Sequence, residues 1–225
     1  MTEQQWLVCA DPQAMLTVVK GVASDRKLRL FACACCRRNW GLLADERSRA
    51  AVEAAERFAD SLGTRKDLEA AKAAALGAAS AVGLGGPGAS DSDRLGGYYA
   101  AAASARCAER QAIAAASQAA LWAVGHASLL GPDGAAAQCE LLRDLFGSPF
   151  GPPPAVEEAT LAWGDGAVCR VAQSIYGEGR FEDMPILADA LEDAGCSNAG
   201  ILDHCRGPGV HARGCFVLDL LLGRG

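Results

Sequence analysis

The sequence predicts an all-helical protein, a multi-helix bundle with short helices at its C-terminal end. Hydrophobic residues make up 51% of the 225 residues but aromatic residues only 6%, because alanine supplies much of the apolar content. Alanine favours helix because it loses no side-chain entropy on entering one. Capping residues precede most apolar segments, and no segment shows the alternating pattern of a strand hairpin. We therefore expect a core of small side chains and closely packed helices.

The first helices are marked by their capping residues. Asp11 followed by Pro12 predicts the start of a short helix, which Gly21 closes. Ser24 then caps an amphipathic helix over residues 25–43. Its expected buried stripe consists of Leu28, Phe31, Ala32, Cys35 and Leu42.

A helical hairpin is expected next. Asp45 opens a helix that stops at Gly63. Thr64 and Asp67 resemble a capping box ahead of an alanine-rich helix over residues 68–83. The buried stripe of the first helix is predicted to be Ala51, Val52, Ala55, Phe58 and Leu62.

The middle of the chain predicts a loop followed by more helix. Residues 83–93 (GLGGPGASDSD) are rich in glycine and small polar residues, which disfavour helix. Residues 93–130 predict one long helix or two stacked helices, with His126 as a hydrogen-bonded core histidine. Residues 136–147 predict a further short helix. The glycine-rich stretch does not indicate a nucleotide loop, because no strand precedes it and no Lys-Ser/Thr pair follows.

The prolines of SPFGPPP at residues 148–154 force an extended connection and mark the best internal boundary. We divide the chain there into an alanine-rich helical bundle, residues 1–148, and a C-terminal helical subdomain, residues 149–225. The two are expected to pack as one compact unit. Beyond the boundary, helices are expected at residues 166–179, 183–196, 199–207 after Asn198 as cap, and 215–223.

Charge and hydropathy exclude some partners. The formal net charge is −6 and the basic residues are mixed with acids, so we expect no nucleic-acid partner. No apolar run is long enough to cross a bilayer, and the polar start lacks the layout of a secretion signal. We therefore expect a cytoplasmic protein with reduced cysteines, no membrane contact and a protein partner.

Three stretches together resemble a known family. They are DRKLRLFACACCRRNW at residues 25–40, LLRDLFGSPF at residues 141–150, and the run from PILADALEDAGC to DLLLG at residues 185–223. The chain resembles a protein family without a known activity that is expanded in planctomycete bacteria. The resemblance covers most of the chain, although residues 64–137 match only in being alanine-rich. It implies kinship and no activity, substrate or cofactor.

The stretch HCRGPGVHARGC at residues 204–215 holds two of the three histidines and two of the ten cysteines. Zinc prefers four tetrahedral nitrogen and sulfur ligands, and two short helices joined by RGPGV bring such side chains together. The candidate ligands for zinc or iron are Cys196, His204, His211 and Cys215. Their spacing matches no zinc-finger pattern, because the stretch lacks a CxxC knuckle.

The same residues also fit a packing interpretation, which the sequence leaves open. Cys196 follows a glycine that ends a helix, and Cys215 fits as a small buried thiol. His204 and Arg206 lie in a last helical turn, where positive charge favours the helix dipole.

A second group of cysteines occurs in CACCRR. Cys33 and Cys36 are helical neighbours three residues apart and supply two thiolates for a metal if the chain ends meet. Cys35 points toward the apolar stripe and is expected in the core. Because this CxxC lies within a helix, a thioredoxin-like redox pair is not indicated, and packing is the favoured interpretation.

These observations favour a non-enzymatic protein-interaction or regulatory module. The alternative is a metal-binding or redox-sensing protein that uses the C-terminal Cys/His residues. A second alternative is a cysteine-dependent enzyme, because Cys205 or Cys215, a histidine and an aspartate supply the residue types without a recognised motif.

Overall fold

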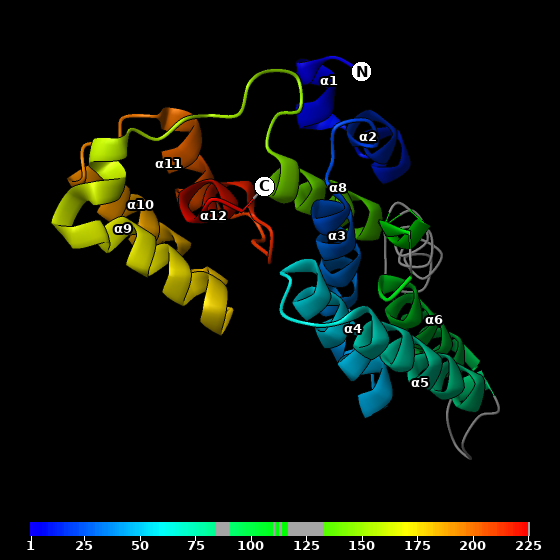
Figure 1. The fold of residues 1–225 in the computed structure, drawn as a ribbon. Helices are drawn as coiled ribbons and strands as arrows, with labels where there is room; N and C mark the ends of the chain where they lie inside the picture. Colours follow the sequence, from blue (N-terminus) through cyan, green and yellow to red (C-terminus); the bar gives the residue numbers. More distant parts are fainter. Residues whose placement is uncertain (84–90, 110, 113, 117–132, 225) are drawn as a thin grey trace. The chain divides into compact units, whose positions relative to one another are not determined.

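The computed structural model describes residues 1–83, 91–109, 111–112, 114–116 and 133–224. Its regular structure is helical, and no strand occurs in these ranges (Figure 1). The all-α prediction is confirmed. Most of the predicted loop at 83–93 and the end of the predicted 93–130 segment, including His126, lie outside the described residues.

The chain forms two compact units. The middle unit comprises Val8–Cys139, and the terminal unit joins Met1–Leu7 to Glu140–Gly225. This division falls within a helix rather than in the proline-rich connection at 148–154, and it places the N-terminal residues with the C-terminal ones. The boundary predicted after residue 148 stays a prediction.

The middle unit is a group of packed helices. In it α3 packs on α4 and α6, α4 packs on α5 and α6, and α5 packs on α6. The helices are α2 (Pro12–Val19), α3 (Asp25–Arg38), the short 3-10 helix η1 (Trp40–Leu42), α4 (Glu46–Ala59), α5 (Arg65–Gly83) and α6 (Asp91–Cys107).

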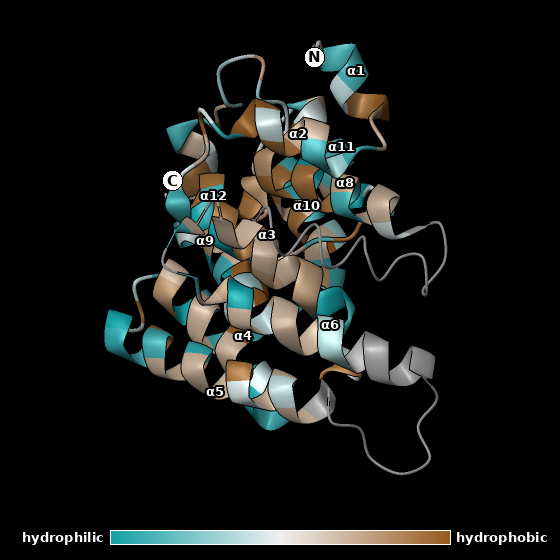
Figure 2. Cartoon of the chain, turned by 90° about the vertical axis from the view of Figure 1, so that its right-hand side faces the viewer, coloured by the Kyte–Doolittle hydropathy of each residue, from teal (hydrophilic) through white to brown (hydrophobic). Residues whose placement is uncertain are grey.

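Small side chains and thiols fill the middle unit. Every residue from 28 to 36 in α3 is buried, and Figure 2 shows hydrophobic colour along much of this helix. The core around it includes Ala32, Cys33, Cys36, Leu43, Val52, Ala55, Leu68, Ala100, Ala103, Cys107, Ala108 and Ala115. Narrow side chains allow helix axes to approach closely, as the alanine-rich composition predicts.

The predicted caps are confirmed by hydrogen bonds. Asp11 accepts from the backbone N–H groups of the first turn of α2, and Ser24 accepts from Lys27 N–H at the start of α3. The capping box of α5 is present: Thr64 N–H donates to Asp67 at 3.0 Å, and Asp67 N–H donates to Thr64 Oγ1 at 3.2 Å.

The terminal unit contains the remaining short helices. Within it α9 packs on α10 and α12, and α11 packs on α10 and α12. The helices are α1 (Glu3–Val8), α8 (Asp133–Phe146), which enters this unit at Glu140, α9 (Glu158–Glu178), η2 (Phe181–Asp183), α10 (Met184–Asp193), α11 (Ala199–Arg206) and α12 (Phe216–Leu222).

Larger apolar side chains form the core of the terminal unit. The buried residues of this core are Val168, Ala172, Ile175, Tyr176, Met184, Leu187, Ala188, Leu191, Ile201, Leu202, Cys205, Cys215, Val217, Leu218 and Leu221. Cys215 is therefore a member of the core as well as a candidate ligand. This core fixes the ends of α11 and α12, from which candidate ligands extend.

Two helices of the middle unit end earlier than expected. The helix expected to reach Gly63 ends at Ala59, because Ser61 adopts a left-handed φ of 60°. Leu62, predicted to be buried, is 72% exposed. The helix predicted for residues 25–43 ends at Arg38 and is followed by η1.

None of the described helices combines the length and the apolar character that a membrane crossing requires.

Candidate metal centre

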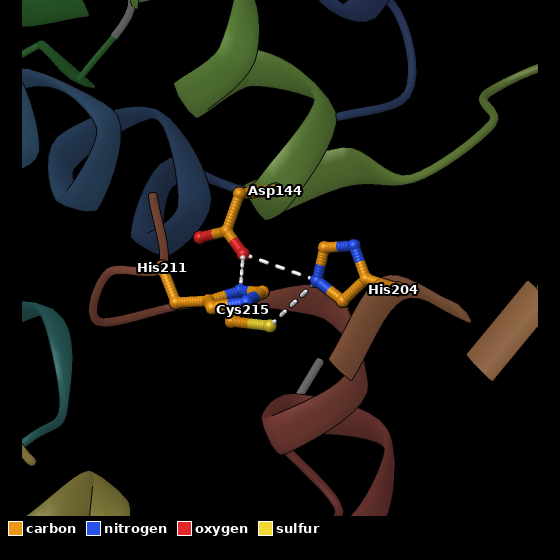
Figure 3. Close-up of side chains that lie close together, drawn as sticks. All are labelled: Asp144, His204, His211 and Cys215. Atoms are coloured by element: carbon orange, nitrogen blue, oxygen red, sulfur yellow. Dashed lines mark hydrogen bonds and ion pairs between the residues drawn. The ribbon is translucent and has the colours of Figure 1, made fainter. Parts of the chain in front are cut away.

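Four side chains of the terminal unit converge on one point. Asp144 lies in the last turn of α8 and His204 in the last turn of α11. His211 and Cys215 come from the loop between α11 and α12, with Cys215 directly before α12 (Figure 3). One candidate ligand atom from each residue lies within 4.8 Å of the other three.

The shortest distances in this cluster involve the Asp144 carboxylate or the His204 ring. His204 Nε2 lies 3.1 Å from Asp144 Oδ1 and 3.2 Å from Cys215 Sγ. His211 Nδ1 lies 2.8 Å from the same Asp144 Oδ1 (Figure 3). The two imidazoles thus meet at Asp144 Oδ1, and Cys215 joins them through His204.

The second carboxylate oxygen of Asp144 is held by the backbone. Ala212 N–H donates to Asp144 Oδ2 at 2.9 Å. Cys215 N–H in turn donates to the Ala212 carbonyl oxygen at 2.9 Å, which folds the loop into a turn ahead of α12. Gly214 allows this turn because its φ is +87°, a conformation that side chains disfavour. The loop therefore positions His211 and Cys215 together with Asp144.

The cluster is largely shielded from solvent. The side chains of Asp144 and His211 are 3% and 6% exposed, that of His204 is 19% exposed, and Cys215 is fully buried. Phe216 covers one side, with its ring centroid 4.4 Å from that of His204. Ionic and polar groups in such a place are costly unless each finds a partner.

Burial and mutual contacts shift the acidity of two members. Burial by itself would raise the pKa of Asp144, but hydrogen bonds from His204 and His211 outweigh it and hold that pKa below its ordinary value. Burial and the nearby Asp144 charge raise the pKa of Cys215 well above its ordinary value. Without a cation, Asp144 is therefore ionised and Cys215 is a neutral thiol at neutral pH.

One nitrogen in the cluster is left unsatisfied. His211 Nε2 is buried and has no hydrogen-bond partner among the described residues. Buried polar atoms without partners are rare, and a bound water or ion is a common reason for them. The two nitrogens of an imidazole point in different directions, so only one of the His211 nitrogens can face an ion in the cluster. The donor set of the cluster fits a site that takes a cation.

Three of the four ligands predicted from sequence belong to this cluster, and Cys196 does not. Cys196 follows α10, where its N–H donates to the Leu191 carbonyl at 2.9 Å and its side chain packs partly buried on the core. Asp144 takes the fourth place and was not predicted. The available signal was a carboxylate set among Leu141, Leu142 and Leu145, the buried leucines of α8.

Cys33 and Cys36 belong to the middle unit, where their common neighbour is Cys107. The Sγ atoms of Cys36 and Cys107 lie 3.4 Å apart, and Cys33 Sγ lies 3.8 Å from the Val52 carbonyl oxygen. All three thiols are buried, and burial raises the pKa of Cys33. Reactive cysteines are accessible and have lowered pKa values, so this environment favours the packing interpretation.

No family model, curated protein or solved structure matches this chain.

Proposed function

We propose that the protein binds one zinc ion through Asp144, His204, His211 and Cys215. The observation that carries this proposal is that His204 Nε2 faces both Asp144 Oδ1, at 3.1 Å, and Cys215 Sγ, at 3.2 Å. Ligands about 2.0–2.3 Å from a tetrahedral ion lie about 3.3–3.8 Å from one another. The three shortest separations in the cluster, 2.8, 3.1 and 3.2 Å, are below this range, and the four candidate atoms all lie within 4.8 Å of one another. An ion would therefore move the closest pairs slightly apart and draw the most distant pair together.

The same contact argues against a cysteine nucleophile activated by histidine. In such a triad the imidazole uses one nitrogen for the nucleophile and the other for the orienting carboxylate. Here Asp144 and Cys215 both contact Nε2 of His204. A single proton on that nitrogen cannot serve both partners at full strength, whereas a cation between the three groups attracts all of them.

The donor types favour zinc among common protein metals. Magnesium and calcium prefer oxygen ligands, whereas zinc takes imidazole nitrogen, thiolate sulfur and carboxylate oxygen together. With two neutral imidazoles, one carboxylate and one thiolate, a zinc ion gives a centre of zero net charge. A neutral centre suits the buried environment of Asp144 and Cys215.

A zinc ion with four protein ligands suits a structural role better than a catalytic role. Catalytic zinc sites keep one position for water or substrate, whereas structural sites are closed by four side chains. The proposed ligands join the end of α8 to α11 and to the loop before α12, and 60 residues separate Asp144 from His204. The ion would therefore hold together segments that are distant in sequence.

Metal analysis of protein purified without an affinity tag tests the proposal. We expect about one zinc per chain, and its loss in Cys215→Ser and in His211→Ala. Cys196→Ser is the matched control, because it alters another cysteine of the same unit that lies outside the cluster.

Two results would contradict the proposal. One is wild-type protein that takes up no zinc after reduction and incubation with zinc salt. The other is equal loss of zinc from the Cys196→Ser and Cys215→Ser proteins, which would place the ligands elsewhere.

A further inference from the structure

The N-terminal segment, residues 1–7, docks on the terminal unit through a short helix. Its helix α1 spans only Glu3–Val8, and helices this short are not stable alone in water. A local capping box helps it: Thr2 N–H donates to Gln5 Oε1, and Gln5 N–H donates to Thr2 Oγ1. The conformation of the segment therefore depends on its docking.

Trp6 is the anchor of this segment. Its side chain is fully buried, and its Nε1–H donates to the Gly147 carbonyl oxygen at 2.9 Å. Arg143 donates to the Trp6 carbonyl oxygen from Nε at 3.2 Å and from a terminal nitrogen at 3.0 Å. Phe150 packs edge-on against the indole ring, with centroids 6.1 Å apart. We call Arg143, Gly147 and Phe150 the Trp6 socket.

The Trp6 socket is built on the same helical turn as the proposed metal centre. Arg143 directly precedes Asp144, and Gly147 N–H donates to the Arg143 carbonyl oxygen at 2.9 Å, which closes α8. Gly147 has a φ of +58° and lies so close to Phe216 that an added Cβ would be 3.3 Å from that ring. The Phe216 ring also contacts the His204 ring at a tilt of 54°. Continuous contacts thus run from the metal centre to Trp6.

We propose that metal occupancy of the Asp144 centre regulates the docking of residues 1–7. This inference rests on the proposed zinc site. With the ion bound, Asp144 and His204 fix the last turn of α8 against α11, and the Trp6 socket keeps its shape. Without the ion, that turn is held only by the hydrogen bonds of Asp144 to the two imidazoles and to Ala212 N–H. The socket then loosens, and a segment too short to stay helical alone is released.

Hydrogen–deuterium exchange of the full-length protein, with and without zinc, tests the proposal. We expect amides of residues 3–8 to exchange about tenfold more slowly in zinc-loaded protein than after chelation, a coupling of ordinary size. Asp144→Asn should abolish this difference. Glu140→Gln is the control, because it removes an exposed carboxylate from the same helix and should preserve the difference.

A reciprocal measurement uses a residue outside the ligand set. If zinc strengthens docking, docking must strengthen zinc binding by the same factor. Trp6→Ala should therefore weaken zinc affinity by about tenfold, whereas Leu7→Ala, which alters an exposed neighbour in α1, should not.

The outcomes separate this proposal from the proposed zinc site. Stoichiometric zinc binding with unchanged exchange in residues 3–8, or with unchanged affinity in Trp6→Ala, would overturn the coupling and leave the zinc site standing. Absence of zinc binding to the wild-type protein would overturn both.

Discussion

Asp144 is the single residue on which the proposed centre depends most. Both of its oxygens are used, Oδ1 toward the two imidazoles and Oδ2 toward Ala212 N–H. The burial of this carboxylate is tolerated because both oxygens have hydrogen-bond donors and, as proposed, a cation as partners.

Asp144→Asn should weaken zinc binding by more than about a hundredfold. The amide oxygen still accepts the Ala212 hydrogen bond, but the charge that balances the ion is lost, and removing an outer partner of a ligand alone costs about 10–100-fold. Competition with a chromophoric chelator measures the affinity. Affinity within a factor of two or so of wild type would remove Asp144 from the ligand set.

The buried thiol of Cys35 should make the stability of the middle unit depend on pH in the alkaline range. Burial, reinforced by the neighbouring Cys36 and Cys33, raises the pKa of Cys35 well above the ordinary value of 9.0. The unfolded chain therefore loses this proton at lower pH than the folded chain. The contribution of this thiol to the free energy of unfolding is fully present below pH 9.0. It falls as the pH rises, by at most about 1.4 kcal/mol per pH unit.

Cys35→Ala should flatten this alkaline loss of stability. Urea unfolding at pH 8 and at pH 10.5 measures the change in the free energy of unfolding for both proteins. Cys9→Ala, which alters a cysteine that is only partly buried, is the control. An equal loss in wild type and Cys35→Ala would show that this thiol does not limit stability at high pH.

For single residues, the sequence indicates which types of side chain form the cluster better than it indicates which individual residues do. His204, His211 and Cys215 lie within one short stretch, so their clustering is visible in the sequence. Asp144 reaches them only through the tertiary fold. Cys196 was chosen for its residue type, yet its position after α10 directs it to the apolar core.

Among the elements, α3 is tied to the end of α6 by a buried arginine. Arg29 is 3% exposed, and one of its terminal nitrogens donates to the carbonyl oxygens of Cys107 at 2.8 Å and Glu109 at 2.7 Å. The last carbonyls of a helix have no partner within the helix. Arg29 satisfies two carbonyls at this end from a neighbouring helix.

Arg29→Met should destabilise the middle unit by about 2–4 kcal/mol. The substitution keeps most of the aliphatic volume but leaves buried carbonyl oxygens without their charged donor. Urea unfolding followed by circular dichroism measures the loss. Arg38→Met, at an exposed position in the last turn of the same helix, should change stability by less than about 0.5 kcal/mol. Equal effects of the two substitutions would contradict this role of Arg29.

Helix starts were predicted more accurately than helix ends. Asp11, Ser24, Asp45 and Asn198 cap as expected, because an N-cap is a local hydrogen bond between neighbours in sequence. The left-handed turn at Ser61 ends α4 early and exposes Leu62, which an apolar stripe alone does not indicate. Within α9 the regular helix resumes after the left-handed residues Gly164, Asp165 and Gly166, close to its expected start at residue 166.

For the whole molecule, the sequence predicts the helical class because alanine content and capping residues act along the entire chain. The grouping of Met1–Leu7 with Glu140–Gly225 depends on Trp6 and its socket, and composition gives no sign of such a distant contact. A role through protein contacts and the predicted family resemblance remain predictions.

Zinc should stabilise the protein against heat. An ion that binds only the folded state at 100 times its dissociation constant adds about 2.7 kcal/mol. Differential scanning calorimetry should show a higher melting temperature with zinc than with chelator, and no such difference in His211→Ala. The same increase in His211→Ala would indicate that zinc stabilises the protein from another site.

Zinc-edge X-ray absorption of the metal-loaded protein tests the central claim most directly. The proposed centre predicts one sulfur at about 2.3 Å and three nitrogen or oxygen neighbours at about 2.0–2.1 Å. Substitution of Cys215 by serine should remove the sulfur contribution. A shell with two or more sulfur atoms, or one with none in the wild-type protein, would contradict a centre formed by Asp144, His204, His211 and Cys215.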